Sequence, residues 1–123
     1  MKIFLTMIGF LFSVAAFTQS GDDVVSALKQ GSAAEFSQYF SNSVDVKLPN
    51  KDEMKSLKKP DAASAVSVFF SANKIKGFDV ISQREMNGTM YIAGKLTGSQ
   101  SYNMTVMLKN SGKAMEVITI RIS

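Results

Sequence analysis

The 123-residue sequence contains no cysteine, no histidine and no tryptophan, and it has only two prolines. Without cysteine the chain forms no disulfide and offers no thiol nucleophile. Without histidine it lacks a serine–histidine relay and the common ligands of zinc and haem. These absences remove most familiar catalytic machinery. We therefore predict a protein that is not an enzyme and that holds no metal and no cofactor.

Hydrophobic residues make up 46% of the chain and charged residues 20%. This composition is too apolar for a disordered chain, and the length suits a single hydrophobic core. We predict one globular domain, which covers residues 21–123.

Residues 1–20 have the pattern of a secretory signal peptide. A basic residue precedes an apolar run over Ile3–Phe12, and small and polar residues follow up to Ser20. The run is about half of the roughly 20 residues that a membrane-spanning helix needs. We predict cleavage after Thr18 or Ser20, export to the periplasm or the extracellular medium, and no stable membrane insertion afterwards. An uncleaved membrane anchor is the alternative.

The net charge of +4 is concentrated in a lysine-rich stretch between Lys47 and Lys59, which Asp52 and Glu53 interrupt. A nucleic-acid-binding surface normally brings more arginine and interleaved aromatic residues than this stretch contains. We therefore predict no nucleic-acid partner and interpret the stretch as a solvated face. A weak anion-binding or membrane-surface patch is the alternative.

Three segments show the three-to-four-residue apolar spacing of a helix. The first follows the cap Asp22 and ends at Gly31, and the second begins at once with the capping-box pair of Ser32 and Glu35. The third runs from about Pro60 to Asn73. Its predicted buried stripe comprises Ala62, Ala65, Val66, Phe69 and Phe70, and the apolar face of the second helix comprises Ala33, Phe36, Tyr39 and Phe40.

Two strands are predicted before the third helix and four after it. Ser43–Leu48 alternates apolar and polar residues, and a short segment around Glu53–Leu57 returns beside it. The later strands are predicted over residues 78–86, 89–96, 101–109 and 113–122. Asn87 and Gly88, between the first two of these, form the strongest short hairpin signal.

The last predicted strand carries β-branched residues on both faces. Simple alternation divides it into two sets, with Ile118, Ile120 and Ile122 on one face and Val117, Thr119 and Arg121 on the other. A strand of this kind is typical of a central or covered position in a sheet. Together with Met107, its apolar residues also indicate a patch on the sheet that a partner protein would cover.

The order of these elements, ααββαββββ, and three stretches of sequence resemble a known family. The stretches are GDDVVSALKQGSAAEFSQYFSNSVDVKLP, FDVISQREMNGTMYIAGKLTGSQSYNMTVMLKN and the terminal VITIRIS. They are similar to small secreted bacterial proteins that form a domain of unknown function in the nuclear transport factor 2-like (cystatin-like) superfamily. The resemblance implies an α+β cone, in which a strongly bent antiparallel sheet wraps the third helix and leaves a pocket at its open end. It also implies a homodimer through the outer face of the sheet.

Five side chains are candidates for lining such a pocket, namely Tyr39, Phe69, Arg84, Tyr91 and Tyr102. Core packing is the alternative for Tyr39, and an ordinary surface position is the alternative for Arg84 and Tyr91.

Enzymes that resemble ketosteroid isomerase or scytalone dehydratase place acidic, tyrosine or histidine side chains inside the cone. Here the acidic candidates are Asp45, Asp79, Glu85 and Glu116, and simple alternation places each of them opposite the more apolar face. A general base needs a desolvated pocket, which an outward carboxylate lacks. We therefore predict a noncatalytic exported module that holds a small apolar or amphipathic ligand, or a peptide. A homodimer or partner subunit that acts by protein–protein contact is the second hypothesis, and an isomerase or dehydratase is the third.

Overall fold

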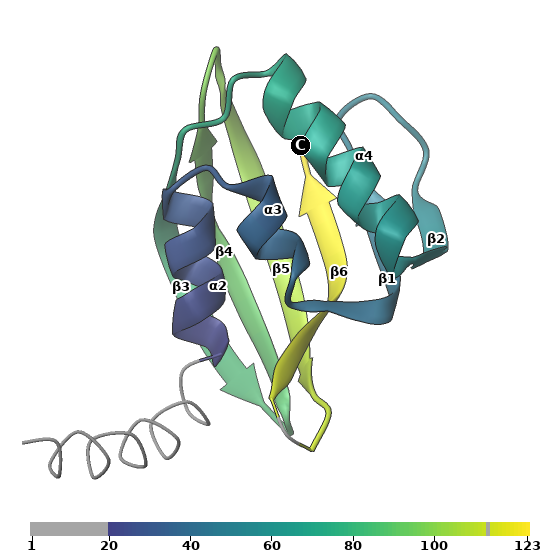
Figure 1. Cartoon of the computed structure of the whole chain (residues 1–123). Coiled ribbons are helices and arrows are strands. Elements are labelled where there is room, and N and C mark those ends of the chain that lie inside the picture. The colour runs from purple at the N-terminus through teal and green to yellow at the C-terminus, as the bar shows by residue number, and fades with distance from the viewer. Residues whose placement is uncertain (1–19, 113) are drawn as a thin grey trace, which may run out of the picture.

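The computed structural model describes residues 20–112 and 114–123, in which three helices lie on one face of a six-stranded sheet (Figure 1). The helices are α2 (Ser20–Lys29), α3 (Ala33–Ser37) and α4 (Lys59–Ala72). The strands are β1 (Phe40–Lys47), β2 (Met54–Lys58), β3 (Gly77–Met86), β4 (Thr89–Thr97), β5 (Ser101–Asn110) and β6 (Met115–Ile122). This order confirms the predicted ααββαββββ arrangement and the α+β class. Apart from Ser20, the predicted signal peptide over residues 1–20 lies outside the described residues, as does Lys113 of the last predicted strand.

The strands follow one another across the sheet in the order β2-β1-β6-β5-β4-β3. Strand β6 therefore lies between β1 and β5, as its two-sided apolar pattern predicted. The β1–β6 pair is parallel, whereas the other four pairs are antiparallel as expected. A parallel pair needs a long crossover connection. Here α4 carries the chain from the first hairpin to the far edge at β3, and three antiparallel steps bring β6 back beside β1.

The hydrophobic core fills the space between the helices and the inner face of the sheet. Its fully buried large side chains on the strands include Ile92, Leu96, Met104, Leu108, Ile120 and Ile122. From the helices, Phe36 of α3 stacks on Phe70 of α4 with ring centroids 6.5 Å apart and meets Phe40 of β1 edge-on at 5.0 Å. This aromatic cluster ties α3, α4 and the sheet together, and each fully buried side chain contributes about 1.5–3 kcal/mol. None of the described helices has the length and apolarity to cross a bilayer.

The second helix is shorter than its sequence pattern predicted. It ends at Ser37, and Phe40 is the first residue of β1. The N–H of Val117 donates to the carbonyl oxygen of Tyr39 at 2.7 Å, and Phe40 is paired with Val117 across the sheet. Strand pairing therefore takes the chain away from the helical path, although Phe40 stays buried as the helical spacing had suggested.

The buried stripe of α4 is also narrower than predicted. Ala62, Val66 and Phe70 are buried, whereas Ala65 and Phe69 are only half-buried. The helix is thus turned so that its second apolar row lies at the margin of the core.

Two β-bulges reverse the alternation that the sequence suggested. In β3 the register shifts between Val80 and Ser82, so Ile81 is the extra residue, and Glu85 comes to share the inner face with Met90. In β6 Ile118 is the extra residue between the partners of Met107 and Leu108. Val117 is consequently buried together with Ile120 and Ile122, which corrects the prediction that Val117 and Ile120 face opposite sides.

We expect the replacement Phe70→Ala to lower the free energy of unfolding by about 3–5 kcal/mol, because it removes the ring that stacks on Phe36 from a packed core. The control Val68→Ala lies two residues away in α4, where Val68 is 65% exposed, and should change stability by less than about 0.5 kcal/mol. Urea denaturation monitored by circular dichroism measures both. Equal, small losses would contradict the packing of α4 described here.

Candidate functional site

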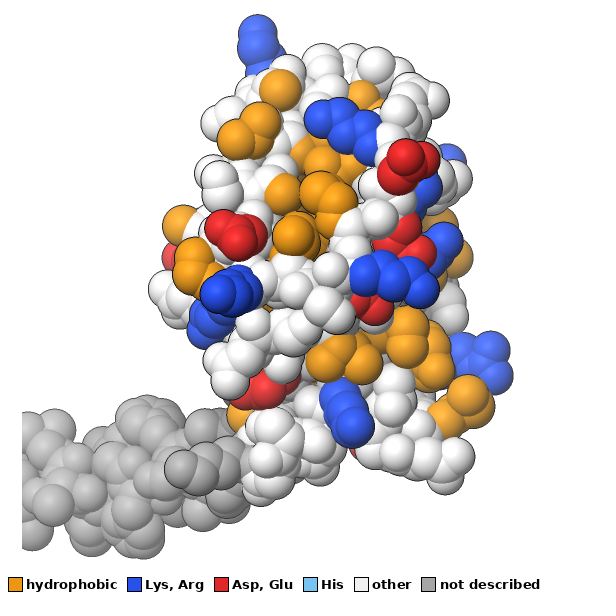
Figure 2. Space-filling model, turned by 90° about the vertical axis from the view of Figure 1, so that its right-hand side faces the viewer, with side chains coloured by type: hydrophobic (Ala, Val, Ile, Leu, Met, Phe, Trp, Pro, Cys, Tyr) orange, Lys and Arg blue, Asp and Glu red, His pale blue; other side chains and the backbone are white. Residues whose placement is uncertain are grey.

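A cleft opens where the ends of three strands meet. Strand β1 ends at Lys47, the parallel strand β6 ends beside it at Ile122, and the antiparallel strand β5 begins at Ser101. Between this end of the sheet and α4 lies a cleft of about 560 Å³. Figure 2 shows the molecule from the side on which β1 and β2 lie in Figure 1; hydrophobic side chains form a band over the upper half of this face, with lysine and arginine side chains beside it.

One wall of the cleft is an apolar row on α4. Ala65, Val68, Phe69 and Ala72 line the cleft and recur three and four residues apart, next to the buried row of the same helix. A surface helix normally carries polar residues beyond its core stripe. Val68, at 65% exposure, is therefore an apolar side chain in a position where solvation alone would favour a polar one.

The opposite wall is a tight turn that follows β1. Leu48, Pro49, Asn50 and Lys51 all line the cleft, and the N–H of Lys51 donates to the carbonyl oxygen of Leu48 at 3.3 Å. Asn50 has a positive φ of 63°. Proline at the second position and a positive φ at the third are the features of a type II turn. The turn therefore fixes the backbone of Lys51, which is the only charged residue among the described residues that line the cleft.

The third side of the cleft is a hydrogen-bonded group around Asn73, which follows the last residue of α4. The hydroxyl of Tyr102 donates to Asn73 Oδ1 at 2.8 Å, and Asn73 Nδ2 donates to the carbonyl oxygen of Phe69 at 2.9 Å. The backbone carbonyl of Asn73 accepts from both the N–H and the hydroxyl of Ser99. The rings of Phe69 and Tyr102 meet edge-on with centroids 5.1 Å apart. These contacts hold this side of the cleft in place without a ligand.

Two of the five predicted pocket residues, Phe69 and Tyr102, lie together in this cleft. The other three, Tyr39, Arg84 and Tyr91, do not line it. Arg84 and Tyr91 are cross-strand partners of β3 and β4, and they lie on the outer face because Tyr91 alternates with the buried Ile92. Tyr39 precedes the first residue of β1, so it lies at the opposite end of that strand from the cleft. Arg84 and Tyr91 thus do not line the cleft, and they occupy the ordinary surface position that was the alternative for both.

The sequence reasoning missed several residues of the cleft. Leu48, Met54 and Val68 supply apolar surface, and Lys51 supplies charge. Two features of the sequence indicate this cleft. One is the dipeptide Pro49-Asn50, a turn signal directly after a strand, and the other is the third helix, which carries more apolar residues than one buried stripe requires.

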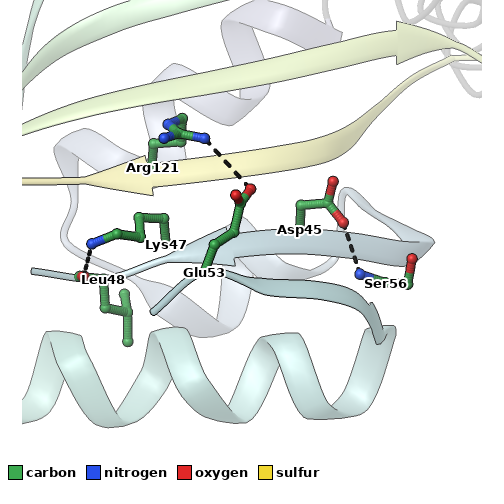
Figure 3. Close-up of polar contacts among 6 residues, drawn as sticks. All are labelled: Asp45, Lys47, Leu48, Glu53, Ser56 and Arg121. Atoms are coloured by element: carbon green, nitrogen blue, oxygen red, sulfur yellow. Dashed lines mark hydrogen bonds and ion pairs between the residues drawn. The ribbon is translucent and has the colours of Figure 1, made fainter. Parts of the chain in front are cut away.

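The acidic candidates lie outside the cleft. Asp45 accepts a hydrogen bond from the N–H of Ser56 at 2.7 Å (Figure 3). Asp79 and Glu85 are exposed on β3, and Glu116 is half-buried in β6. Within residues 20–112 and 114–123, no three acidic side chains come together as a group that could hold a metal ion. What the cleft offers chemically is therefore apolar surface, amide and hydroxyl groups, and one ammonium group.

A second polar group lies beside the cleft on the outer side of the first hairpin. Arg121 of β6 contacts Glu53 at 3.4 Å between Nη1 and Oε2, and Lys47 Nζ donates to the carbonyl oxygen of Leu48 at 2.9 Å (Figure 3). These contacts join β1, β6 and the segment before β2. The carboxylate of Glu53 is thereby engaged by arginine rather than by the lysines of the hairpin.

The phenol of Tyr39 has a displaced pKa. Burial and, to a smaller extent, the negative charges of Asp23 and Glu35 raise the pKa of its phenol above the ordinary value of 10.0. The folded state thus holds the phenolic proton more tightly than the unfolded chain does. The resulting contribution to stability is present below pH 10 and is lost as the pH rises through and beyond that value.

Titration followed by the ultraviolet absorbance of tyrosinate tests this assignment. The difference between wild type and Tyr39→Phe isolates the ionisation of Tyr39, and we expect its midpoint to lie above pH 10. A difference curve centred at or below pH 10 would contradict the described surroundings of this phenol.

The replacement Tyr102→Phe removes the hydrogen bond to Asn73 and should lower the free energy of unfolding by about 1 kcal/mol. The matched control Tyr91→Phe removes a hydroxyl that makes no hydrogen bond to the described residues, and it should change stability by less than about 0.5 kcal/mol. Urea denaturation measures both. If the two variants lose the same amount, the hydrogen bond at Asn73 does not organise the cleft.

The chain is similar to known proteins in both sequence and fold. The sequence profile of a domain of unknown function, DUF4783, matches residues 21–123. A crystal structure of a DUF4783 family protein from Bacteroides ovatus is similar at 27% identity, with a TM-score of 0.76 over 81% of this chain and 90% of that one. A DUF4783 protein from Bacteroides fragilis matches at 26% identity and a TM-score of 0.75, over 81% of this chain and 93% of its own.

The likeness extends to a more distant structure. An uncharacterised cystatin-fold protein from Novosphingobium aromaticivorans shares 7% identity and has a TM-score of 0.63, over 85% of this chain and 95% of its own. At this identity the likeness concerns the fold alone, and it confirms the nuclear transport factor 2-like (cystatin-like) cone that the sequence predicted. No curated protein matches the chain.

Proposed function

Because the chain belongs to the DUF4783 family and has a nuclear transport factor 2-like fold with a cleft beside α4, we propose that it is a noncatalytic binding protein. Its ligand is a small apolar or amphipathic molecule that lies in the cleft between α4 and the turn after β1. The observation that carries this proposal is the apolar row of α4, in which Val68 stays exposed beside Ala65, Phe69 and Ala72.

The dimensions and the lining of the cleft support this function. Its volume of about 560 Å³ falls within the range of roughly 300–1,000 Å³ that is usual for small-molecule sites. Such sites are lined mainly by apolar side chains, with a few polar groups that orient the ligand. Here those polar groups come from the turn at Asn50 and from the group around Asn73. The turn and the group around Asn73 are fixed by hydrogen bonds, so a ligand would lose little free energy to ordering these two sides of the cleft.

We propose that the protein binds its ligand without catalysing a reaction. None of the acidic candidates, Asp45, Asp79, Glu85 and Glu116, belongs to the lining of the cleft. Proton abstraction from a bound ligand needs a base within hydrogen-bond reach, and the lining offers no carboxylate for that role. We further propose that the protein acts after export, because residues 1–20 have the pattern of a cleaved signal peptide.

The homodimer through the outer face of the sheet stays a prediction. The apolar residues of β6 that the sequence suggested for its interface do not support it. Val117, Ile120 and Ile122 are buried against the helices, so they add nothing to an outer apolar patch. Met107 and its cross-strand partner Tyr91 lie on the outer face.

A variant that fills the cleft tests the proposal. Ala72 is exposed and lines the cleft, so Ala72→Trp should leave the fold intact and weaken binding of the neutral apolar fluorophore N-phenyl-1-naphthylamine at least tenfold. The control Ala34→Trp introduces the same side chain at an exposed position of α3 outside the cleft and should bind as wild type does. Fluorescence titration measures the dissociation constants. The proposal fails if wild type does not bind the fluorophore, or if both variants bind it equally well.

A further inference from the structure

The lining of the cleft carries positive charge and no negative charge among the described residues. Lys51 is the only charged residue among the described residues that line it, and no carboxylate joins it there. Among the described residues the only ion pair is that between Arg121 and Glu53, so Lys51 has no acidic partner within them. The ammonium group of Lys51 is thus available to a ligand.

The nearby acidic side chains do not cancel this charge. Glu53 is paired with Arg121, and Asp45 accepts from the N–H of Ser56 on the outer side of the hairpin. Asp52, next to Lys51 in the chain, is exposed and does not line the cleft. The charge that the described lining residues carry is therefore positive, which favours an anion over a cation as the ligand.

The backbone that carries Lys51 is also fixed relative to the apolar surface. The type II turn holds the backbone of Lys51 on one side of the cleft, and the row containing Val68 and Phe69 faces the cleft from α4. A molecule that contacts both must have an apolar body and a charged end. The amide of Asn50 in the same turn supplies a further hydrogen-bond donor to such an end.

Resting on the proposed binding function, we infer that the ligand is an anionic amphiphile with a carboxylate-type head group. The head group contacts the ammonium group of Lys51, and the apolar chain lies along Val68 and Phe69. Within the lysine-rich stretch, which was interpreted above as a solvated face, Lys51 thus contacts the ligand. Lys55 of the same stretch does not line the cleft.

Three probes with the same twelve-carbon chain test this inference, namely dodecanoate, dodecanol and dodecyltrimethylammonium, each used below the concentration at which it aggregates. Displacement of N-phenyl-1-naphthylamine gives their affinities. We expect dodecanoate to bind about two- to fivefold more tightly than dodecanol, in keeping with the modest strength of a solvent-accessible ion pair, and the cation to bind most weakly.

The variant Lys51→Gln should reduce the affinity for dodecanoate to that for dodecanol and leave dodecanol binding unchanged. Lys55→Gln removes the same net charge outside the cleft and is the matched control, for which no change is expected. The conservative variant Lys51→Arg should retain the preference for the anion. Since Lys51 is exposed, none of these variants should impair folding.

The outcomes separate the inference from the proposed function. Equal binding of all three probes, or an unchanged dodecanoate affinity in Lys51→Gln, would overturn the anionic head group while the cleft remained a binding site. If neither the fluorophore nor any probe bound, the proposed function would fail and the inference with it. If wild type, but not Lys51→Gln, co-sedimented with phosphatidylglycerol vesicles, Lys51 would bind lipid head groups in a bilayer. That result would overturn the inference that the ligand is a free amphiphile.

Discussion

The packing of α4 against α3 and the inner face of the sheet sets the position of the cleft. Phe70 stacks on Phe36. Together with Val66 and Ala62 it forms the row of α4 that is buried in the core. Once that row is buried, the neighbouring apolar row of the helix must lie at the margin, facing the turn after β1. The α4 wall of the cleft is therefore a consequence of how the core packs.

Local signals in the sequence were sufficient for the order of the elements. Pro60 at the start of α4 and Gly31 after α2 mark helix ends by their backbone preferences. Asn87 and Gly88 have positive φ angles of 52° and 79°, as the predicted two-residue hairpin turn requires. These features depend on neighbouring residues only, and a single sequence displays them.

Features that depend on distant partners could not be predicted in the same way. Nothing near Ile81 or Ile118 marks either as a bulge, because the extra residue is defined by the strand that it fails to pair with. For the same reason the sequence left two positions open for Arg84 and Tyr91, the pocket and the surface, and both residues lie on the outer face. Phe69 and Tyr102, two of the five pocket candidates, meet in the cleft because α4 packs beside the start of β5. Lys51 was missed because its position follows from the turn at Pro49-Asn50 and from α4 opposite it.

The central claim is that the cleft holds a ligand, and native mass spectrometry of the protein purified without detergent from its own cells tests it most directly. The account predicts an additional mass of a few hundred daltons or less that is lost on denaturation and is absent from Ala72→Trp. A spectrum that shows only the polypeptide in both proteins, from cells in which the protein is exported and folded, would contradict it.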